Sequence, residues 1–218
     1  MAALKYNDHF ACAGTIISSN KILTAANCFW CRNQPLEECV KNFTVQTGSA
    51  DLSIDGNLHR VKEIKIFDGY TGKFANDIAV VTLQSEIMFS ANEKAASLPD
   101  TDITENTVAI SSGWGIKTED SKIDNKLASI EEKILSASKC NEFFLKNGPN
   151  IDVDDNDFCA IAASGNNNTG LCVGDTGNPS VVGGTVIGVA TYGVGCGKGF
   201  PDVFTNVYRF LKFIKSQL

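Results

Sequence analysis

Short runs of apolar and β-branched residues, separated by polar residues, recur along most of this chain. Strands of about four to eight residues with glycine- and asparagine-rich turns between them are typical of antiparallel sheets. Many short strands and little helix predict an all-β chain built from antiparallel sandwiches or barrels. The segments that fit this pattern are 14–17, 21–24, 43–47, 78–83, 107–111, 180–182 and 185–190.

The end of the chain follows a different pattern, with apolar residues at helical spacing and lysines between them. This pattern predicts an amphipathic helix within 207–218 that packs on the body of the protein. A change in composition near 97–102 marks the expected crossing between two halves, so we predict domains at 1–100 and 101–206. The residues that define the helix are Val207, Phe210, Leu211, Lys212, Ile214 and Lys215.

The composition is that of an ordinary globular protein. The chain has 218 residues, 43% hydrophobic and 20% charged, which is long enough for a large core in one or two domains. A net charge of −6 argues against a nucleic-acid partner, because phosphate binding needs a concentrated basic face. No apolar run approaches the ~18 residues of a transmembrane helix, so we expect no membrane partner.

Cysteine usage points to an oxidising compartment. Eight cysteines are an even number and predict four disulfides in a secreted protein. Two sequons, at Asn42 and Asn167, are compatible with glycosylation there. Residues 1–10 lack the apolar segment of a signal peptide, so we expect the targeting segment to lie outside this chain.

Two stretches invite a metal interpretation. The acidic run 152–157 suits either a solvated loop or a calcium site, and no glycine follows at the position that an EF-hand requires. Cys28 and Cys31 have the spacing of a redox or zinc motif, but neither a second such pair nor a βαβ context accompanies them. We therefore expect a solvated loop, no metal and no cofactor.

Three strings carry the candidate chemistry: Cys-Val-Gly-Asp-Thr-Gly-Asn-Pro at 172–179, Leu-Thr-Ala-Ala-Asn-Cys at 23–28, and Asn-Asp-Ile-Ala-Val-Val-Thr-Leu at 76–83. They resemble the nucleophile, general-base and aspartate segments of chymotrypsin-like serine proteases. Asp77 matches the family's aspartate. Thr176 stands in place of the serine, and Asn27 stands in place of the histidine.

The resemblance covers almost the whole chain, including Cys12-Ala-Gly and Ser112-Gly-Trp-Gly. It implies two antiparallel six-stranded β-barrels that meet face to face, with the site between them and a C-terminal α-helix after the second. By position it also implies four disulfides, namely Cys12–Cys28, Cys140–Cys159, Cys172–Cys196 and, from the remaining cysteines, Cys31–Cys39.

Within this family the chain resembles the scabies-mite inactivated serine protease paralogues, which are relatives of the mite group 3 allergens. Members of that group carry mutated triads on a protease frame, are secreted into the mite gut and interfere with host complement. The resemblance therefore implies an extracellular binding protein whose partners are host proteins, above all complement components.

Acyl transfer on this frame needs a hydroxyl nucleophile, an imidazole base and an orienting carboxylate. The carboxamide of Asn27 has no useful basicity, and the extra methyl of Thr176 stiffens χ1 and misdirects the hydroxyl. Only two histidines are present, His9 and His59, and we expect both to be surface or loop residues. The chemistry is therefore predicted to fail.

Other parts of the machinery match the family unevenly. Gly174 and the backbone amide of Thr176 fall at the oxyanion-hole positions. Asp175 is the residue that pairs in the family with a freshly cut N-terminal ammonium, and this chain has no Ile-Val-Gly-Gly start. Either the ammonium partner lies outside this chain, or another group satisfies Asp175. Asn178 replaces the family's second glycine.

The resemblance also locates a specificity pocket. Gly170 falls at its base, where trypsin-like enzymes carry aspartate, and Asp202 falls at a wall position that is usually glycine. The strand that pairs with the substrate backbone would contain Thr191, Tyr192 and Gly193. The Asp202 carboxylate either favours a basic substrate side chain or fills the pocket, and the narrow wall favours filling. A sugar on Asn167 would obstruct it further.

Three functional hypotheses follow. The first is a secreted pseudoprotease that acts by binding proteins. The second is a weak serine-type endopeptidase, which would need hydrolysis that depends on Thr176. The third is a passive decoy for protease inhibitors or antibodies, which would need an open pocket. The sequence favours the first.

Overall fold

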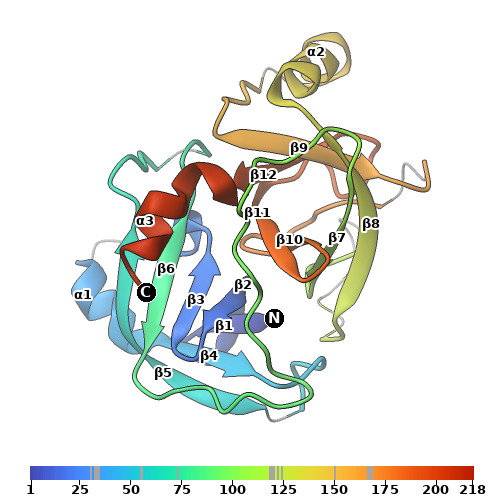
Figure 1. The fold of residues 1–218 in the computed structure, drawn as a ribbon. Helices are drawn as coiled ribbons and strands as arrows, with labels where there is room; N and C mark the ends of the chain where they lie inside the picture. Colours follow the sequence, from blue (N-terminus) through green and yellow to red (C-terminus); the bar gives the residue numbers. More distant parts are fainter. Residues whose placement is uncertain are drawn as a thin grey trace.

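The computed structural model describes the whole chain except residues 30, 32–34, 55, 73, 118–120, 122, 124, 150 and 166–168. Its strands form two closed antiparallel barrels, each of six strands (Figure 1). The predicted all-β class and double-barrel architecture are thus confirmed. The first barrel uses strands within 2–83 and the second uses strands within 108–206. The predicted domain boundary after residue 100 falls in the connecting segment and stays a prediction.

The first barrel has the strand order β1-β2-β3-β6-β5-β4. Inward and outward residues alternate along its long strand β5, as expected where one sheet face is buried. Short helical segments η1 (Ala26–Phe29), α1 (Leu36–Cys39) and η2 (Val40–Asn42) connect β3 to β4. The strands are β1 (Ala2–Tyr6), β2 (His9–Ser18), β3 (Lys21–Thr24), β4 (Phe43–Thr47), β5 (Asn57–Ile66) and β6 (Ala79–Leu83).

The second barrel has the order β10-β11-β12-β9-β8-β7. An α-helix that the sequence pattern did not predict, α2 (Ala137–Asn147), projects from it, capped by the Ser136 hydroxyl. Only Cys140 and Phe144 of this helix are buried, so its apolar stripe is too narrow to stand out in the sequence. The strands are β7 (Val108–Gly113), β8 (Ala128–Leu135), β9 (Asp157–Ala162), β10 (Pro179–Val182), β11 (Thr185–Tyr192) and β12 (Asp202–Asn206).

The chain ends in a short helix, as predicted, but it begins as a 3₁₀ turn. Segment η3 (Val207–Phe210) precedes α3 (Leu211–Lys215). Val207, Phe210 and Ile214 are buried in a cluster that contains residues of both barrels, so the helix joins them. Figure 1 shows α3 lying against the first barrel, beside β6. Leu211 is only half-buried.

Four disulfides join Cys12 to Cys28, Cys31 to Cys39, Cys140 to Cys159 and Cys172 to Cys196. These are the pairs that the family resemblance implied. They leave the Cys28-Phe-Trp-Cys31 spacing without a redox or zinc role, because its two cysteines belong to different bridges. Of the sequons, Asn42 is partly exposed at the end of η2, and Asn167 lies outside the described residues.

Two expectations about polar residues were wrong. His59 is no loop residue but lies in β5 with a 6% exposed side chain, bonded to the hydroxyls of Thr47 and Ser85. The run 152–157 is not a fully solvated loop, because Val153 and Asp157 are buried. In both places the barrel interior admits a polar residue at an inward position, which a hydrophobic pattern cannot reveal.

Candidate functional site

The first barrel places Asn27 beside Asp77. Asn27 lies in η1, the element that follows β3, and Asp77 lies just before β6, the neighbour of β3. The backbone N–H of Asn27 donates to Asp77 Oδ1 at 2.7 Å, and Thr191 Oγ1 donates to Oδ2 at 2.6 Å. Asp77 is fully buried, and this burial raises its pKa to about 6. The carboxylate therefore links the two barrels through Thr191.

The Thr176 loop is held from both sides. Ala13 N–H of β2 donates to the Thr176 carbonyl at 3.0 Å, and Gly177 N–H donates to the Ala190 carbonyl of β11 at 2.8 Å. A Cβ at Gly177 would lie 2.2 Å from the Ala13 carbonyl oxygen, and its φ is +85°. Only glycine allows this approach. Thr176 is therefore positioned at the junction of the barrels.

Neither the Asn27 carboxamide nor the Thr176 hydroxyl makes a side-chain hydrogen bond within the described part of the chain. The chain's two histidines lie elsewhere, His59 as described above and His9 with Nδ1 at 2.7 Å from the Asn7 carbonyl oxygen. The sequence predicted that Asn27, Asp77 and Thr176 lie at one site. In the structure, hydrogen bonds join Asp77 to Asn27 and to Thr191.

The oxyanion-hole positions keep their donors. Gly174 has a φ of +97°, which turns the backbone ahead of Thr176. The backbone N–H groups of Gly174 and Thr176 donate to no carbonyl or side chain among the described residues. Two unused N–H groups of this kind could receive an oxyanion.

The Asp175 carboxyl accepts hydrogen bonds from other groups of this chain, as in the second alternative given above, in which a group other than an N-terminal ammonium satisfies it. It is 9% exposed and accepts from Gly115 N–H at 2.9 Å, Cys172 N–H at 2.9 Å and Asn178 Nδ2 at 2.7 Å. Burial raises its pKa, and these donors oppose that shift. A cavity of about 270 Å³ borders Asp175 and Asn178. The substituted residue Asn178 thus supplies one of the three bonds.

Asp202 lies inside the predicted specificity pocket. A Cβ built at Gly170 would lie 2.8 Å from Asp202 Oδ2, and one at Gly193 would lie 3.0 Å from Oδ1, so the carboxyl stands between the two glycines. Leu171 N–H donates to Oδ2 at 2.7 Å, and Asp202 is 3% exposed. The carboxyl therefore occupies the space that a substrate side chain would need.

Glu132 is a residue of this site that sequence reasoning missed. It is fully buried in β8, and its pKa is raised to about 7 by burial. Burial and the nearby charge of Glu132 also raise the pKa of Asp202. The signal was available, because Glu132 and Ile134 share the inward face of β8, where a charged residue is unusual.

An aromatic pair lies at the predicted substrate-pairing strand. The ring of Tyr192 lies 4.4 Å, centroid to centroid, from that of Phe74, which comes from the loop before Asp77. Phe74 is 45% exposed and was not singled out by the sequence. The pair places the Phe74 ring against Tyr192 at the end of β11. Among the described residues, no group of His, Cys, Asp and Glu side chains could hold a metal ion.

Comparison with known proteins agrees with this geometry. The trypsin family model matches residues 1–214. Trypsin epsilon of Drosophila erecta is 30% identical over 97% of this chain and 78% of its own length. Trypsin alpha of Drosophila melanogaster is 34% identical over 98% of this chain and 80% of its own length.

The crystal structure of scabies mite inactivated protease paralogue S-D1 is similar, with a TM-score of 0.85 and 25% identity. The match covers 99% of this chain and 90% of that one. No helix in the described ranges is long and apolar enough to cross a membrane. With its double barrel, its disulfides and a family match over nearly its full length, this chain belongs to the trypsin family.

Proposed function

We propose that this protein is a catalytically inactive serine protease homologue that acts by binding other proteins. The observation that carries this proposal is the environment of Asp77. Its two oxygens accept hydrogen bonds from the Asn27 amide and the Thr191 hydroxyl, and the adjacent side chain is a carboxamide. Asp77 therefore has no imidazole to orient, and the Thr176 hydroxyl has no base to take its proton.

The expected loss of rate is large. Removing the base or the nucleophile of a related triad lowers kcat by on the order of 10⁶, and the two losses are not additive. A protonated hydroxyl is a weak nucleophile. The unused amides of Gly174 and Thr176 cannot compensate, because they stabilise an oxyanion only after a nucleophile has attacked.

The filled pocket supports the same conclusion from the substrate side. Asp202 stands between Gly170 and Gly193, and the Phe74 ring packs on Tyr192 of the adjoining strand. An inhibitor that inserts a side chain into the pocket of an active relative would meet the Asp202 carboxyl. This arrangement weighs against a passive decoy for such inhibitors.

The preserved scaffold supports a binding role outside the cell. Four disulfides brace the frame, and each such bridge typically contributes about 2–4 kcal/mol. Such bridges persist in oxidising compartments, so we include secretion in the proposal. The resemblance of the sequence to the scabies-mite paralogues implies host proteins as partners, with complement components as the first candidates. The structural likeness to an inactivated paralogue of that mite is compatible with this choice.

Inactivity is tested with a fluorogenic peptide library at micromolar protein. We expect no hydrolysis above buffer for the native chain and the same result for Thr176→Val. Hydrolysis by the native chain that Thr176→Val abolishes would overturn the proposal and support the weak endopeptidase.

The binding role is tested by complement-mediated lysis of sensitised erythrocytes, titrated with folded protein and with a reduced, unfolded control. We expect dose-dependent protection by the folded protein alone. The double variant Asn27→His/Thr176→Ser should protect equally, because catalysis is not involved. No protection at micromolar protein would remove complement as the partner.

A further inference from the structure

The Asn42 sequon is a feature of the first barrel that the candidate site does not use. Asn42 ends η2, and Phe43 and Thr44 begin β4. Asparagine followed by any residue except proline and then by serine or threonine is the acceptor sequence for N-linked glycans. Asn178 of this chain is no acceptor, because proline follows it and its side chain is 2% exposed. The surroundings of Asn42 therefore decide whether a glycan fits there.

Asn42 lies among exposed residues. It is half-buried itself, and Lys41 before it is exposed. Its backbone carbonyl accepts from the N–H of Asn7 at 3.0 Å, which places it beside the turn of Asn7 and Asp8 between β1 and β2. Both turn residues are exposed. Figure 1 shows α1, which η2 follows, at the outer edge of the first barrel, so this segment lies at the periphery of the molecule.

The fold makes no use of the Asn42 carboxamide. The hydrogen bond from Asn7 involves the backbone carbonyl, and the Asn42 side chain makes no hydrogen bond with the described residues. A sugar in place of one hydrogen on Nδ2 therefore breaks no contact. Phe43, the next residue, is 4% exposed and packs on the rings of Tyr6 and Phe29. This packing fixes the backbone directly after the glycan-bearing position.

The fold makes no use of the Thr44 hydroxyl either. Phe43 and Val45 of β4 point into the barrel core, so Thr44 between them lies on the outward face. Its Oγ1 is buried and has no hydrogen-bond partner among the described residues. A buried hydroxyl of this kind costs free energy, and valine would suit the folded strand better. The sequon gives the hydroxyl a use before the chain folds, while residue 44 is accessible to the transferase.

We propose that Asn42 carries an N-linked glycan in the secreted protein. The donor is a lipid-pyrophosphate-linked oligosaccharide. Asn42 Nδ2 forms a bond to C1 of its first sugar, the bond from C1 to the pyrophosphate breaks, and the amide proton passes to a base of the transferase. The lipid pyrophosphate leaves, and nothing is oxidised or reduced. The inference rests on secretion, which is part of the proposed function, and not on inactivity or on complement binding.

The test expresses the chain behind a signal peptide in insect cells and maps the peptides of the secreted, folded protein by tandem mass spectrometry. Peptide mapping reads position 42 separately from Asn167. We expect an oligosaccharide of N-acetylglucosamine and mannose on the Asn42 peptide. Peptide N-glycosidase F should remove it and leave an aspartate at position 42. An unmodified Asn42 peptide in the secreted protein would overturn the proposal.

Variants at position 44 separate glycosylation from folding. Thr44→Val should abolish the Asn42 glycan and Thr44→Ser should keep it, because only serine retains the required hydroxyl. After enzymatic removal of the glycan from the native chain, Thr44→Val should show no lower midpoint of urea unfolding, since Thr44 Oγ1 makes no hydrogen bond in the fold. A glycan that persists in Thr44→Val would contradict the assignment to this sequon.

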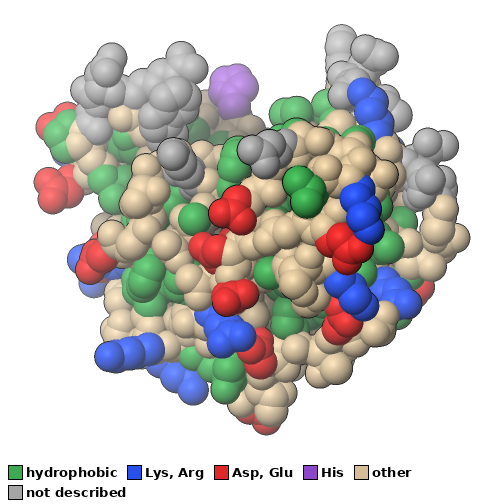
Figure 2. All heavy atoms as spheres, turned by 90° about the horizontal axis from the view of Figure 1, so that it is seen from above, with side chains coloured by type: hydrophobic (Ala, Val, Ile, Leu, Met, Phe, Trp, Pro, Cys, Tyr) green, Lys and Arg blue, Asp and Glu red, His purple; other side chains and the backbone are tan. Residues whose placement is uncertain are grey.

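Asn147→Gln is the matched control for Asn42→Gln. Asn147 is an exposed asparagine at the end of α2 and belongs to no sequon. Figure 2 views the molecule from the α2 end, where acidic and basic side chains stand next to one another at the surface. Asn42→Gln should lose the glycan and Asn147→Gln should keep it, and an equal loss in both would reject the site. The added signal peptide supplies secretion, and peptide mapping reads no binding, so a failure here is distinguishable from a failure of the proposed function.

Discussion

At the residue scale, single substitutions relative to the family determine what the site can do. Asn178 is the clearest case, because its carboxamide donates at 2.7 Å to a buried carboxylate that pairs with an ammonium in active relatives. A neutral donor cannot replace a full charge, and burial still raises the pKa of Asp175. The substitution nevertheless lets the loop hold its shape with groups of this chain alone.

Asn178→Ala should therefore destabilise the fold. It removes a hydrogen bond to a charged group, and such bonds contribute about 1.5–3 kcal/mol. We expect a loss near the lower end of this range, since the unpartnered Asn178 Oδ1 disappears as well. Urea unfolding followed by circular dichroism measures it. Asn92→Ala, in an exposed bend, is the control, and an equal effect in both would contradict the assigned role of Asn178.

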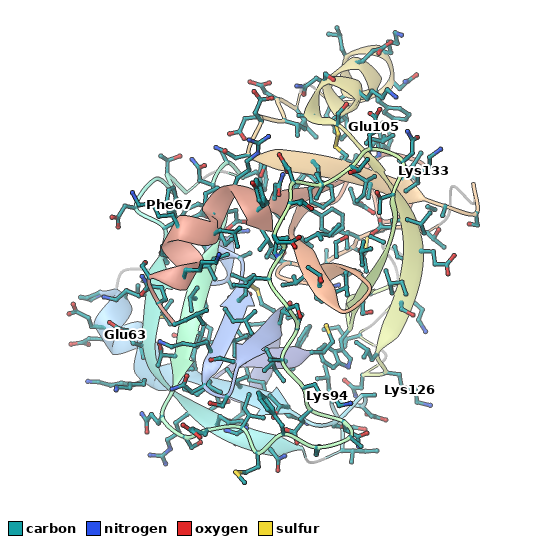
Figure 3. All side chains as sticks on the ribbon, viewed as in Figure 1. Glu63, Phe67, Lys94, Glu105, Lys126 and Lys133 are labelled. Carbon is teal, nitrogen blue, oxygen red and sulfur yellow. A yellow bond between two sulfur atoms is a disulfide. The ribbon has the colours of Figure 1, made fainter. Side chains whose placement is uncertain are left out.

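At the scale of elements, the C-terminal segment joins the two barrels. Phe210 of η3 is buried, and Phe67 meets Phe210 and Phe213 edge-on with centroid distances of 5.0 and 5.5 Å. Figure 3 shows Phe67 beside this helix. A helix as short as α3 is not stable alone, so its stability comes from this packing.

Phe210→Ala should cost about 3–5 kcal/mol, the usual range for removing a buried aromatic ring. The measurement is the free energy of unfolding from urea titration. Leu218→Ala, at a side chain 58% exposed, should change it by no more than about 0.5 kcal/mol. A cost below about 1 kcal/mol for Phe210→Ala would show that α3 is not docked on the barrels.

At the scale of the whole molecule, buried carboxyls dominate the electrostatics. Burial raises the pKa of Asp77 to about 6, of Glu132 to about 7 and of Asp157 to about 8. A carboxyl whose folded pKa lies above its unfolded value destabilises the fold as it ionises, so stability is lost as pH rises through the folded pKa. Glu105 acts in the opposite sense, because Lys139 and Ser136 lower its pKa to about 2, and its contribution is lost as the pH falls from about 4 to about 2.

The melting temperature should therefore be highest at about pH 4, where the unfolded carboxyls begin to ionise, and fall between about pH 4 and about pH 8. Glu132→Gln should reduce that fall by an amount that corresponds to a few kcal/mol, and should change little at about pH 4, where Glu132 is largely protonated in both the folded and the unfolded chain. The exposed neighbour variant Glu131→Gln is the control. Differential scanning calorimetry across this pH range measures the melting temperatures of the native chain and both variants. A melting temperature that rises toward pH 8 would show that these carboxyls are solvated.

Local sequence patterns were enough to predict the chain's architecture and the identity of its altered side chains. Alternating apolar strands, paired cysteines and three family strings are local patterns, and each specifies one arrangement once the family frame is known. Asn27, Thr176 and Asp202 stand out within those strings because each replaces a residue type that the family's chemistry requires. The helix α2 was not predicted, because too few of its residues are buried to give a clear apolar pattern.

Which polar groups face one another could be learned only from the folded arrangement of the strands. Asp202 stands between Gly170 and Gly193, and Asn178 reaches Asp175, because strands distant in sequence are adjacent in the barrel. His59 and Glu132 are buried for the same reason. Desolvation and hydrogen bonding depend on these spatial neighbours. The hydrophobic periodicity along the chain does not indicate which residues become neighbours in the fold.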